Sequence, residues 1–307
     1  MAKYILKRLL ISLLTLWIMF TLTFFLMHFV PGNPFIGEKK MTPEMLANLN
    51  AKYGLDKPLG VQYLNYAKNA LHGDFGQSIQ LIGQDVKDII ARKFPYSLRL
   101  GVFASAVAIV IGTFLGVISA LRKNTNIDRL VMLVVTVGIA VPSFVVATVS
   151  MIVFGVQLQL LPTISDLSTV SSYILPGFAL SFFPLSFITR LMRSSMLDVI
   201  NQDYIRTARA KGLSNRVVIF KHALRNGILP VVTYAGPMVA SVLTGSFVIE
   251  SIFSIPGLGS TFVTSITGRD YTTVMGVTIF FGAILILMNF LVDVIYRFVD
   301  PRINIIN

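Results

Sequence analysis

The sequence predicts an all-α polytopic membrane protein with six transmembrane helices and with both termini in the cytoplasm. Three observations support this fold class. Apolar residues make up 54% of the 307 residues and charged residues only 13%, and the mean hydropathy is +0.75, unlike a soluble domain. Six apolar stretches have about the 20 residues that a helix needs to cross a hydrocarbon core. Basic residues concentrate in the segments that one side of the membrane would share.

The apolar stretches are long enough for six separate crossings. They cover residues 9–30, 98–121, 130–154, 173–192, 229–249 and 274–296. The first resembles a signal peptide, but its apolar run is too long and lacks a small-residue cleavage site, so we expect an uncleaved anchor. Pro142, Pro184 and Pro237 interrupt three stretches, which is tolerated where neighbouring helices satisfy the freed carbonyl groups. We therefore expect kinked helices near a pathway.

The distribution of Lys and Arg sets the orientation, because positive charges in short loops resist translocation. The 122–129 loop carries three basic residues and the 190–228 loop carries eight, whereas the 155–172 loop carries none. The two ends of the chain are also basic, so both are expected in the cytoplasm. The 31–97 segment carries eight basic residues and is still expected outside, since segments longer than about 60 residues translocate largely regardless of charge.

Four parts follow from this topology. They are an N-terminal transmembrane helix (1–30), an extracellular segment with short helices (31–96), a five-helix core (97–298) with a cytoplasmic loop at about 193–228, and a cytoplasmic tail (299–307). In the extracellular segment, Thr42 can cap a helix that has Pro43 in its first turn and Gly54 after its end. A second amphipathic stretch, 61–71, closes at Gly73. An ordinary linker is the alternative interpretation.

No set of residues suggests catalysis or a bound metal. The chain has no cysteine, which excludes disulfides, thiol catalysis and Cys-ligated metals. His28, His72 and His222 fall in different regions without nearby carboxylates at ligand spacing, so we interpret them as structural or surface residues. Residues 32–39 resemble a phosphate-binding loop by spacing, but Glu38 stands where that loop needs Lys. The chain is therefore not expected to be an enzyme or to hold a cofactor.

The number and position of charged residues argue against two further classes of protein, nucleic-acid-binding proteins and carriers powered by protonation. The net charge is +12, but no nucleic-acid recognition fold accompanies it, and membrane topology alone accounts for basic cytoplasmic segments. Ionisable groups are scarce within the six stretches, whereas carriers powered by protonation place them at membrane depth. If the chain takes part in active transport, its energy must come from another source.

The cytoplasmic loop is the most informative segment. Its first part predicts a short helix in which Tyr204, Thr207, Ala208 and Lys211 share one face, and Gly212 breaks that helix. A second helix, capped by Ser214, leads into the next apolar stretch. The small residues of this bent, rigid lever would permit close approach by a partner. A basic helix that lies on anionic lipid is the alternative interpretation.

Residues 204–214 (YIRTARAKGLS) and 222–230 (HALRNGILP) resemble the EAA loop of ABC importer permease subunits, in the form of the oligopeptide and dipeptide branch. The Glu-Ala-Ala of the family corresponds to Arg206, Thr207 and Ala208, of which only the last is kept, and the glycine of the family matches Gly212. The likeness extends over nearly the whole chain. It includes residues 31–34 (PGNP), 53–58 (YGLDKP), 72–76 (HGDFG), 160–163 (LLPT), 250–259 (ESIFSIPGLG) and 269–271 (RDY).

The resemblance implies one half of a type I ABC importer in the cytoplasmic membrane of a prokaryote. A homologous second permease subunit, two ABC ATPase subunits that bind ATP and Mg²⁺, and an extracellular or periplasmic peptide-binding protein would be its partners, with membrane lipid around it. The ATPase would be contacted by residues 201–226. The residues expected to make this contact are Tyr204, Arg206, Thr207, Ala208, Arg209, Ala210, Lys211, Gly212 and Leu213.

Pathway residues are predicted from polar, small and kinked positions in the middle stretches. They are Ser143, Ser181, Thr244 and Ser246, with Phe253, Pro256 and Gly257 in a turn that could form an outer gate. Helix packing is the alternative role for each of them. The expected cargo is an oligopeptide, and the same machinery could carry dipeptides, nickel or another small solute. A carrier or channel that acts alone, and a membrane anchor without transport activity, are the alternatives from other classes.

Overall fold

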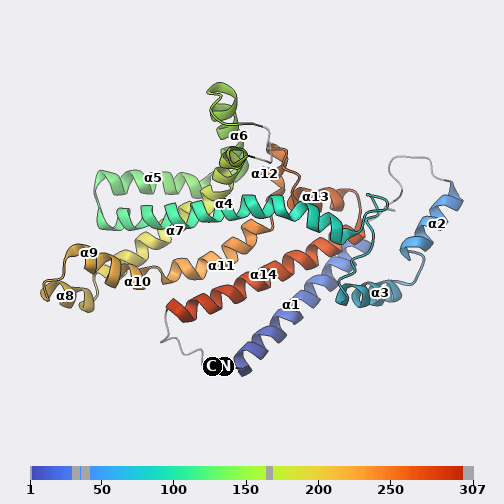
Figure 1. Ribbon diagram of the computed structural model, residues 1–307, viewed down its shortest axis with the longest axis horizontal. Helices are drawn as coiled ribbons and strands as arrows, with labels where there is room; N and C mark the ends of the chain where they lie inside the picture. Colours follow the sequence, from blue (N-terminus) through green and yellow to red (C-terminus); the bar gives the residue numbers. More distant parts are fainter. Residues whose placement is uncertain (1, 30–34, 36–41, 164–168, 300–307) are drawn as a thin grey trace. The chain divides into compact units, whose positions relative to one another are not determined.

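The computed structural model describes residues 2–29, 35, 42–163 and 169–299 (Figure 1). Over these residues the chain is helical and contains no strand beyond a single bridge between Gln77 and Asp85, which confirms the predicted all-α class. The chain divides into two compact units. Unit 1 consists of Met1–Pro95 and Pro256–Ile286, and unit 2 consists of Tyr96–Ile255 and Leu287–Asn307. Residues 256–286, expected in the five-helix core, thus pack with the N-terminal part of the chain.

Unit 1 holds most of the segment that is predicted to be extracellular. Its helices are α1 (Ala2–Phe29), α2 (Pro43–Tyr53), α3 (Leu59–Leu71), the start of α4 (Val86–Leu121), α13 (Leu258–Thr267) and the first part of α14 (Tyr271–Val299). The predicted signals for α2 are confirmed: the Thr42 hydroxyl accepts a hydrogen bond from the amide of Met45 at 3.3 Å, and Gly54 ends the helix with φ +68°. Gly73, with φ +75°, follows α3. Residues 31–34 and 300–307 lie outside the described residues.

Unit 2 is built around α7 (Ile174–Ile200). Its other helices are the rest of α4, α5 (Asn126–Ala140), α6 (Ser143–Ser150), the π-helical η1 (Met151–Gln157), η2 (Val170–Tyr173), α8 (Asp203–Ala210), α9 (Asn215–Val217), the π-helical η3 (Val218–Ala223), α10 (Leu224–Gly227), α11 (Leu229–Leu243) and α12 (Phe247–Ile252). On α7, the side chains of Ile188, Met192 and Met196 are fully buried. Since α7 continues to Ile200, residues 193–200 of the expected cytoplasmic loop are helical.

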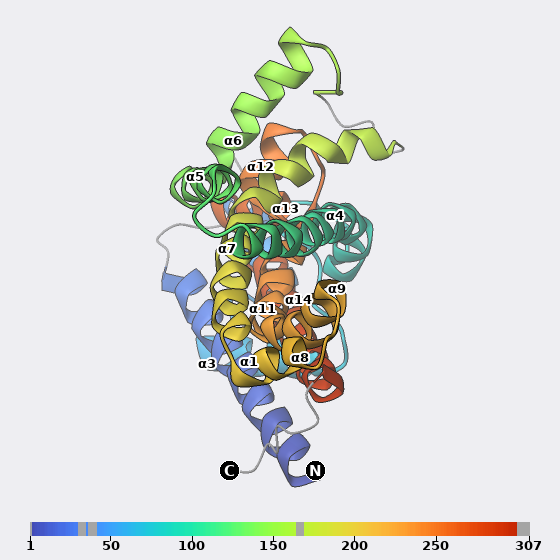
Figure 2. The ribbon, with the colours of Figure 1, turned by 90° about the vertical axis from the view of Figure 1, so that its left-hand side faces the viewer.

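Among the described residues, four helices are long and apolar enough to cross a membrane, and two bent helix pairs bring the number to six if each counts as one span. The four are α1, α4, α7 and α14, as predicted. The stretch at 130–154 has the kink expected at Pro142, and the kink is sharp: α5 and the α6–η1 segment are bent by 108° at this break (Figure 2). The fifth span is bent by 50° where α10 meets α11.

A row of small residues lets α4 approach α7 closely. Every fourth residue from 104 to 120 is Ala or Gly: Ala104, Ala108, Gly112, Gly116 and Ala120. All five are buried, and Gly112 and Gly116 lie directly against α7 residues 185–193. A Cβ atom added at Gly116 would lie 2.6 Å from the Cβ of Met192 and 2.7 Å from the carbonyl oxygen of Thr189. In membranes such small-residue interfaces replace the hydrophobic driving force with close backbone packing.

We therefore expect Gly116→Ala to destabilise the folded protein by about 1–3 kcal/mol, because the added methyl group must push α4 away from α7. The measurement is the midpoint temperature of unfolding in detergent. Gly60→Ala is the matched control, because no atom lies within 4 Å of a Cβ at Gly60 and alanine favours a helix over glycine. Equal midpoints for the two variants would contradict the close packing of α4 on α7.

Candidate functional site

The bent loop that is predicted to be cytoplasmic begins where α7 ends, and α8 and α9 lie together at that end of unit 2 (Figure 1). Asp203 occupies the first turn of α8, where its negative charge favours the helix N-terminus. The other end of α8 closes with two hydrogen bonds, from the amide of Leu213 to the carbonyl of Ala208 (3.4 Å) and from the amide of Gly212 to that of Arg209 (3.0 Å). This is the Schellman arrangement, which requires a left-handed residue, and Gly212 has φ +76°. The predicted break at Gly212 is confirmed.

One face of α8 is anchored to the rest of unit 2. Ile205 is fully buried and Ala208 is 5% exposed, in the same apolar cluster as Met196, Val218 and Ala223. The expectation that Ala208 contacts a partner is therefore corrected, because its side chain packs within this chain. The burial of this face is indicated in the sequence by Ile205, a large apolar residue three positions before Ala208 on the same face of the helix.

The opposite face of α8 is exposed. Tyr204 lies at its edge, and its hydroxyl accepts a hydrogen bond from the Asn226 side-chain amide at 2.9 Å, which links α8 to α10. The other predicted contact residues that are exposed are Arg206, Thr207, Arg209, Ala210, Lys211, Gly212 and Leu213. Every predicted contact residue except Ala208 is thus accessible to another molecule.

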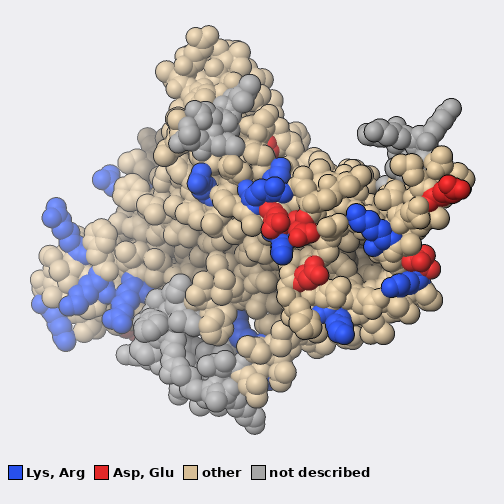
Figure 3. Space-filling view, turned by 45° about the vertical axis from the view of Figure 1, so that its right-hand side comes forward, with Lys and Arg blue, Asp and Glu red and all other residues tan. Residues whose placement is uncertain are grey.

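The loop presents an almost unopposed positive surface. Arg206, Arg209, Lys211, Arg216, Lys221 and Arg225 are all exposed, and Figure 3 shows Lys and Arg side chains gathered at this end of unit 2. The single ion pair among the described residues of the loop joins Arg206 to Asp203 at 3.5 Å, and both side chains are largely exposed. Exposed ion pairs of this kind contribute little to stability. The surface is therefore available for a partner with acidic or carbonyl groups.

Three of the residues predicted to line a pathway form hydrogen bonds within their own helices or at the ends of those helices. Ser181 is fully buried and donates to the Phe178 carbonyl within α7 at 2.9 Å, and Thr244 donates to the Ser241 carbonyl at 2.7 Å. Ser246 caps α12 by accepting from the Ile249 amide at 3.4 Å. These hydrogen bonds suit a packing role, and the pathway role of the three residues stays a prediction.

The predicted gate turn separates α12 from α13, and the boundary between the two compact units falls within it, after Ile255. Phe253 is 1% exposed and belongs to an apolar cluster of unit 2. Its side chain therefore packs inside unit 2, and the role of the turn as an outer gate stays a prediction. Gly257 is buried and Pro256 is partly exposed, and Ser143 is the partly exposed first residue of α6 after the 108° bend.

Comparison with known proteins identifies the family of this chain. A family model described as the inner membrane component of binding-protein-dependent transport systems matches residues 112–305, and a model of the N-terminal part of such components matches residues 1–101. The chain belongs to this permease family. Together the two models cover nearly all of the permease, including both compact units.

Curated relatives match the permease over nearly its whole length. It is 47% identical over 305 residues to the dipeptide transport system permease protein DppB of Bacillus subtilis, covering 99% of each chain. It is 45% identical over 305 residues to the oligopeptide transport system permease protein OppB of Salmonella typhimurium, covering 99% of this chain and all of that relative.

Solved structures share the fold at low identity. A chain of the MetNI methionine ABC transporter in inward-facing conformations has a TM-score of 0.55 at 18% identity, over 69% of the permease and 96% of that chain. A chain of an amino acid ABC transporter crystallised with histidines has a TM-score of 0.53 at 13% identity, over 69% of the permease and 94% of that chain. The predicted type I ABC importer permease fold is confirmed.

In unit 1 of the permease, Asp270 connects residues 78–80 to the start of α14. Its buried carboxylate, 1% exposed, accepts from the Ser78 hydroxyl and from the amides of Ile79 (3.1 Å) and Gln80 (3.4 Å). The amide and hydroxyl of Thr273 also donate to it, at 3.2 and 2.8 Å. The segment after 72–76 is thereby fixed to the start of α14. Residues 72–76 and 269–271 both carry the family resemblance, but no local pattern in the sequence relates Asp270 to residues 78–80.

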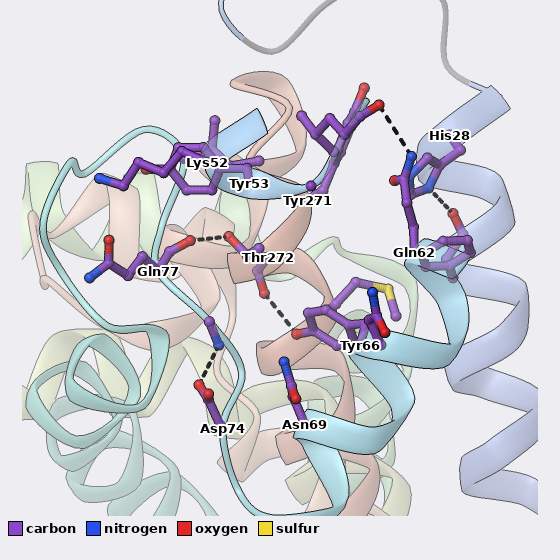
Figure 4. A pocket seen from close by; sticks show the side chains of 17 residues that line it. His28, Lys52, Tyr53, Gln62, Tyr66, Asn69, Asp74, Gln77, Tyr271 and Thr272 are labelled. Atoms are coloured by element: carbon purple, nitrogen blue, oxygen red, sulfur yellow. Dashed lines mark hydrogen bonds between the residues drawn. The ribbon is translucent and has the colours of Figure 1, made fainter. Parts of the chain in front are cut away.

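A cavity of about 310 Å³ opens in unit 1 between α1, α2, α3 and the start of α14 (Figure 4). Several of its polar side chains form hydrogen bonds: His28 Nε2 lies 3.1 Å from Gln62 Oε1, and the Tyr66 hydroxyl donates to the backbone carbonyl of Thr272 at 3.2 Å. Burial, together with the nearby charges of Asp270 and Asp74, raises the pKa of Tyr66 above its ordinary value. Tyr66 therefore stays a hydrogen-bond donor, and His28 has the structural role expected of it.

Proposed function

We propose that this permease is the membrane subunit of an ATP-driven importer that carries oligopeptides across the cytoplasmic membrane of a prokaryote. The single observation that carries the proposal is the exposed, basic, glycine-closed loop at the end of α7, in a chain 45% identical over its whole length to an oligopeptide permease. The bent loop offers a rigid protrusion that a partner can move, and the membrane helices convert that movement into a change of access.

Energy enters from outside the chain in this proposal. Two ATPase subunits bind ATP and Mg²⁺ and each receives one coupling loop, from this permease and from a homologous second permease subunit. A binding protein delivers the peptide from the other side.

The mechanism needs a membrane bundle with two states that differ by a few kcal/mol, so that a loop–ATPase contact can shift the population between them. Closure of the ATPase pair displaces α8. Because Ile205 and Ala208 anchor α8 in the apolar cluster that contains Met196 of α7, the displacement passes to α7 rather than bending the loop alone. The exposed cations Arg209 and Lys211 hold the ATPase surface through charge.

The proposal is tested by reconstitution. The permease is co-expressed with the second permease and the ATPase subunits, purified through a tag on this chain, and placed in liposomes with the binding protein. We expect all four membrane-associated subunits to co-purify and labelled pentapeptide to accumulate only with ATP. Accumulation by the isolated permease without ATP would establish a carrier or channel instead.

Dipeptides are the second candidate cargo, because a dipeptide permease is 47% identical to this chain. The same liposomes can distinguish dipeptides from oligopeptides as the cargo. Unlabelled dipeptide and unlabelled pentapeptide are added in turn, at equal concentration, against labelled pentapeptide. We expect the pentapeptide to compete better; stronger competition by the dipeptide would assign the importer to dipeptides.

A further inference from the structure

An ion pair joins α5 to α7 at the end of unit 2 from which the cytoplasmic loop extends; its carboxylate is buried, whereas the Arg193 side chain is 22% exposed. The guanidinium of Arg193 donates to both oxygens of the Asp128 carboxylate, from Nε to Oδ1 at 2.7 Å and from Nη2 to Oδ2 at 2.8 Å. Asp128 is 4% exposed. A two-point contact between planar groups fixes their relative orientation as well as their distance.

The end of α4 contributes to the same cluster. The Ser119 hydroxyl donates to Asp128 Oδ1 at 2.5 Å, and the amide of Asn124 donates to Oδ2 at 2.9 Å. Asn124 has φ +65°, which turns the chain tightly between α4 and α5. Asp128 thus accepts four hydrogen bonds, and they connect the ends of α4 and α5 to α7.

The cluster around Asp128 lies close to the start of the loop. Arg193 lies roughly two turns before the end of α7, and α8 follows α7 after only Asn201 and Gln202. Figure 1 shows α5 and α7 within unit 2, with α8 beyond the end of α7. Any displacement of α8 reaches the end of α7 first, and the ion pair is the polar connection from there to α5.

Stability alone is a weak reason for such a pair. Removing two charges from water costs several kcal/mol per ion, and buried ion pairs can often be replaced by apolar residues without loss of stability. A bidentate pair does supply orientation, since a sliding movement of α5 along α7 would break both hydrogen bonds at once. The geometry therefore suits a connection that must transmit movement without slipping.

We propose that Asp128 and Arg193 are positioning residues that make the α4–α5 turn and the end of α7 move as one body when the loop is displaced. This proposal rests on the proposed function of the loop. Without the pair, the ATPase still displaces α8 and α7, but α5 no longer follows, so nucleotide hydrolysis continues while peptide uptake falls.

The test uses the complete reconstituted importer with Asp128→Asn and with Arg193→Lys, which keeps the charge but loses the planar fork. We expect peptide taken up per ATP hydrolysed to fall by about fivefold or more, in the range of typical coupling energies. Asp198→Asn and Arg190→Lys are the matched controls, because both side chains are exposed on α7 and form no ion pair with any described residue. An unchanged ratio in assembled Asp128→Asn and Arg193→Lys complexes would overturn the proposal.

A double variant separates coupling from folding. Asp128→Asn combined with Arg193→Gln removes both charges, so no unpaired charge stays buried. If it assembles and the uptake per ATP stays low, the pair transmits movement. If it assembles and regains the wild-type ratio, the pair only supports the fold and the proposal is overturned.

A measurement on the wild-type pair covers the case in which these variants do not assemble. The chain has no cysteine, so spin labels can be attached at Leu133→Cys on α5 and Ser194→Cys on α7, both exposed positions. We expect the distance between the labels to stay constant between the nucleotide-free and ATP-bound importer, and a change would overturn the proposal. Failure of ATP-dependent uptake by the wild-type importer would instead reject the proposed function, whatever the labels report.

Discussion

Replacement of Gly212 by valine is expected to abolish peptide uptake while the permease still inserts in the membrane. Gly212 has φ +76°, a conformation that costs a β-branched residue far more than it costs glycine. No atom lies within 4 Å of a Cβ at this position, so the effect arises from the backbone and not from a clash. The end of α8 must then change, and with it the direction in which the exposed cations point.

Gly212→Asn is the matched control. Asparagine tolerates the left-handed conformation better than other residues with a side chain, and the open surroundings accommodate it. We expect the asparagine variant to keep most of the ATP-dependent uptake and the valine variant to lose at least about tenfold, which corresponds to about 1.4 kcal/mol. Uptake is measured in the reconstituted importer, with the amount of inserted permease determined in parallel. Normal uptake by the valine variant would rule out a fixed bend at Gly212.

Replacement of Asp270 by alanine is expected to detach the segment around Ser78 from the start of α14. The buried amides of Ile79 and Thr273 and the hydroxyl groups of Ser78 and Thr273 would lose their acceptor together. Each buried donor left without a partner costs about 1–3 kcal/mol, so we expect a loss on the order of 3–5 kcal/mol in unit 1. The expected result is rapid cleavage of the 42–95 segment by an added protease.

The protease is added outside right-side-out membrane vesicles, and cleavage is followed over time. Asp56→Ala is the control, because Asp56 is exposed and makes no hydrogen bond or ion pair with the described residues. We expect the control to resist cleavage as the wild type does. Equal resistance of the Asp270→Ala variant would show that apolar contacts alone hold this segment in place.

Local signals in the sequence predicted much of the fold. Length and hydropathy identified α1, α4, α7 and α14 as candidate spans, because each of these helices is long and apolar enough to cross a bilayer. The left-handed break at Gly212 and the cap at Thr42 were also predicted, since each depends on a few adjacent residues.

Features that depend on distant residues were not predictable in this way. Pro142 predicted a kink, but the angle of 108° also reflects how α5 packs on α7, where Gly138 lies against Ser186. Ile205 marks the apolar side of α8 in the sequence, but the burial of that side depends on the apolar cluster around Met196, which distant residues form. Asp128 and Arg193 are 65 positions apart, so no local pattern relates them.

A second contact between distant residues matters for the construction of hybrid proteins from relatives of this permease. The donors at Ser78 and Ile79 lie 192 and 191 positions before the acceptor Asp270, yet they are hydrogen-bonded to it. A chimera that takes its outer region from one relative and its last helix from another will take the donors from one parent and the acceptor from the other. A functional chimera should therefore take both segments from the same parent.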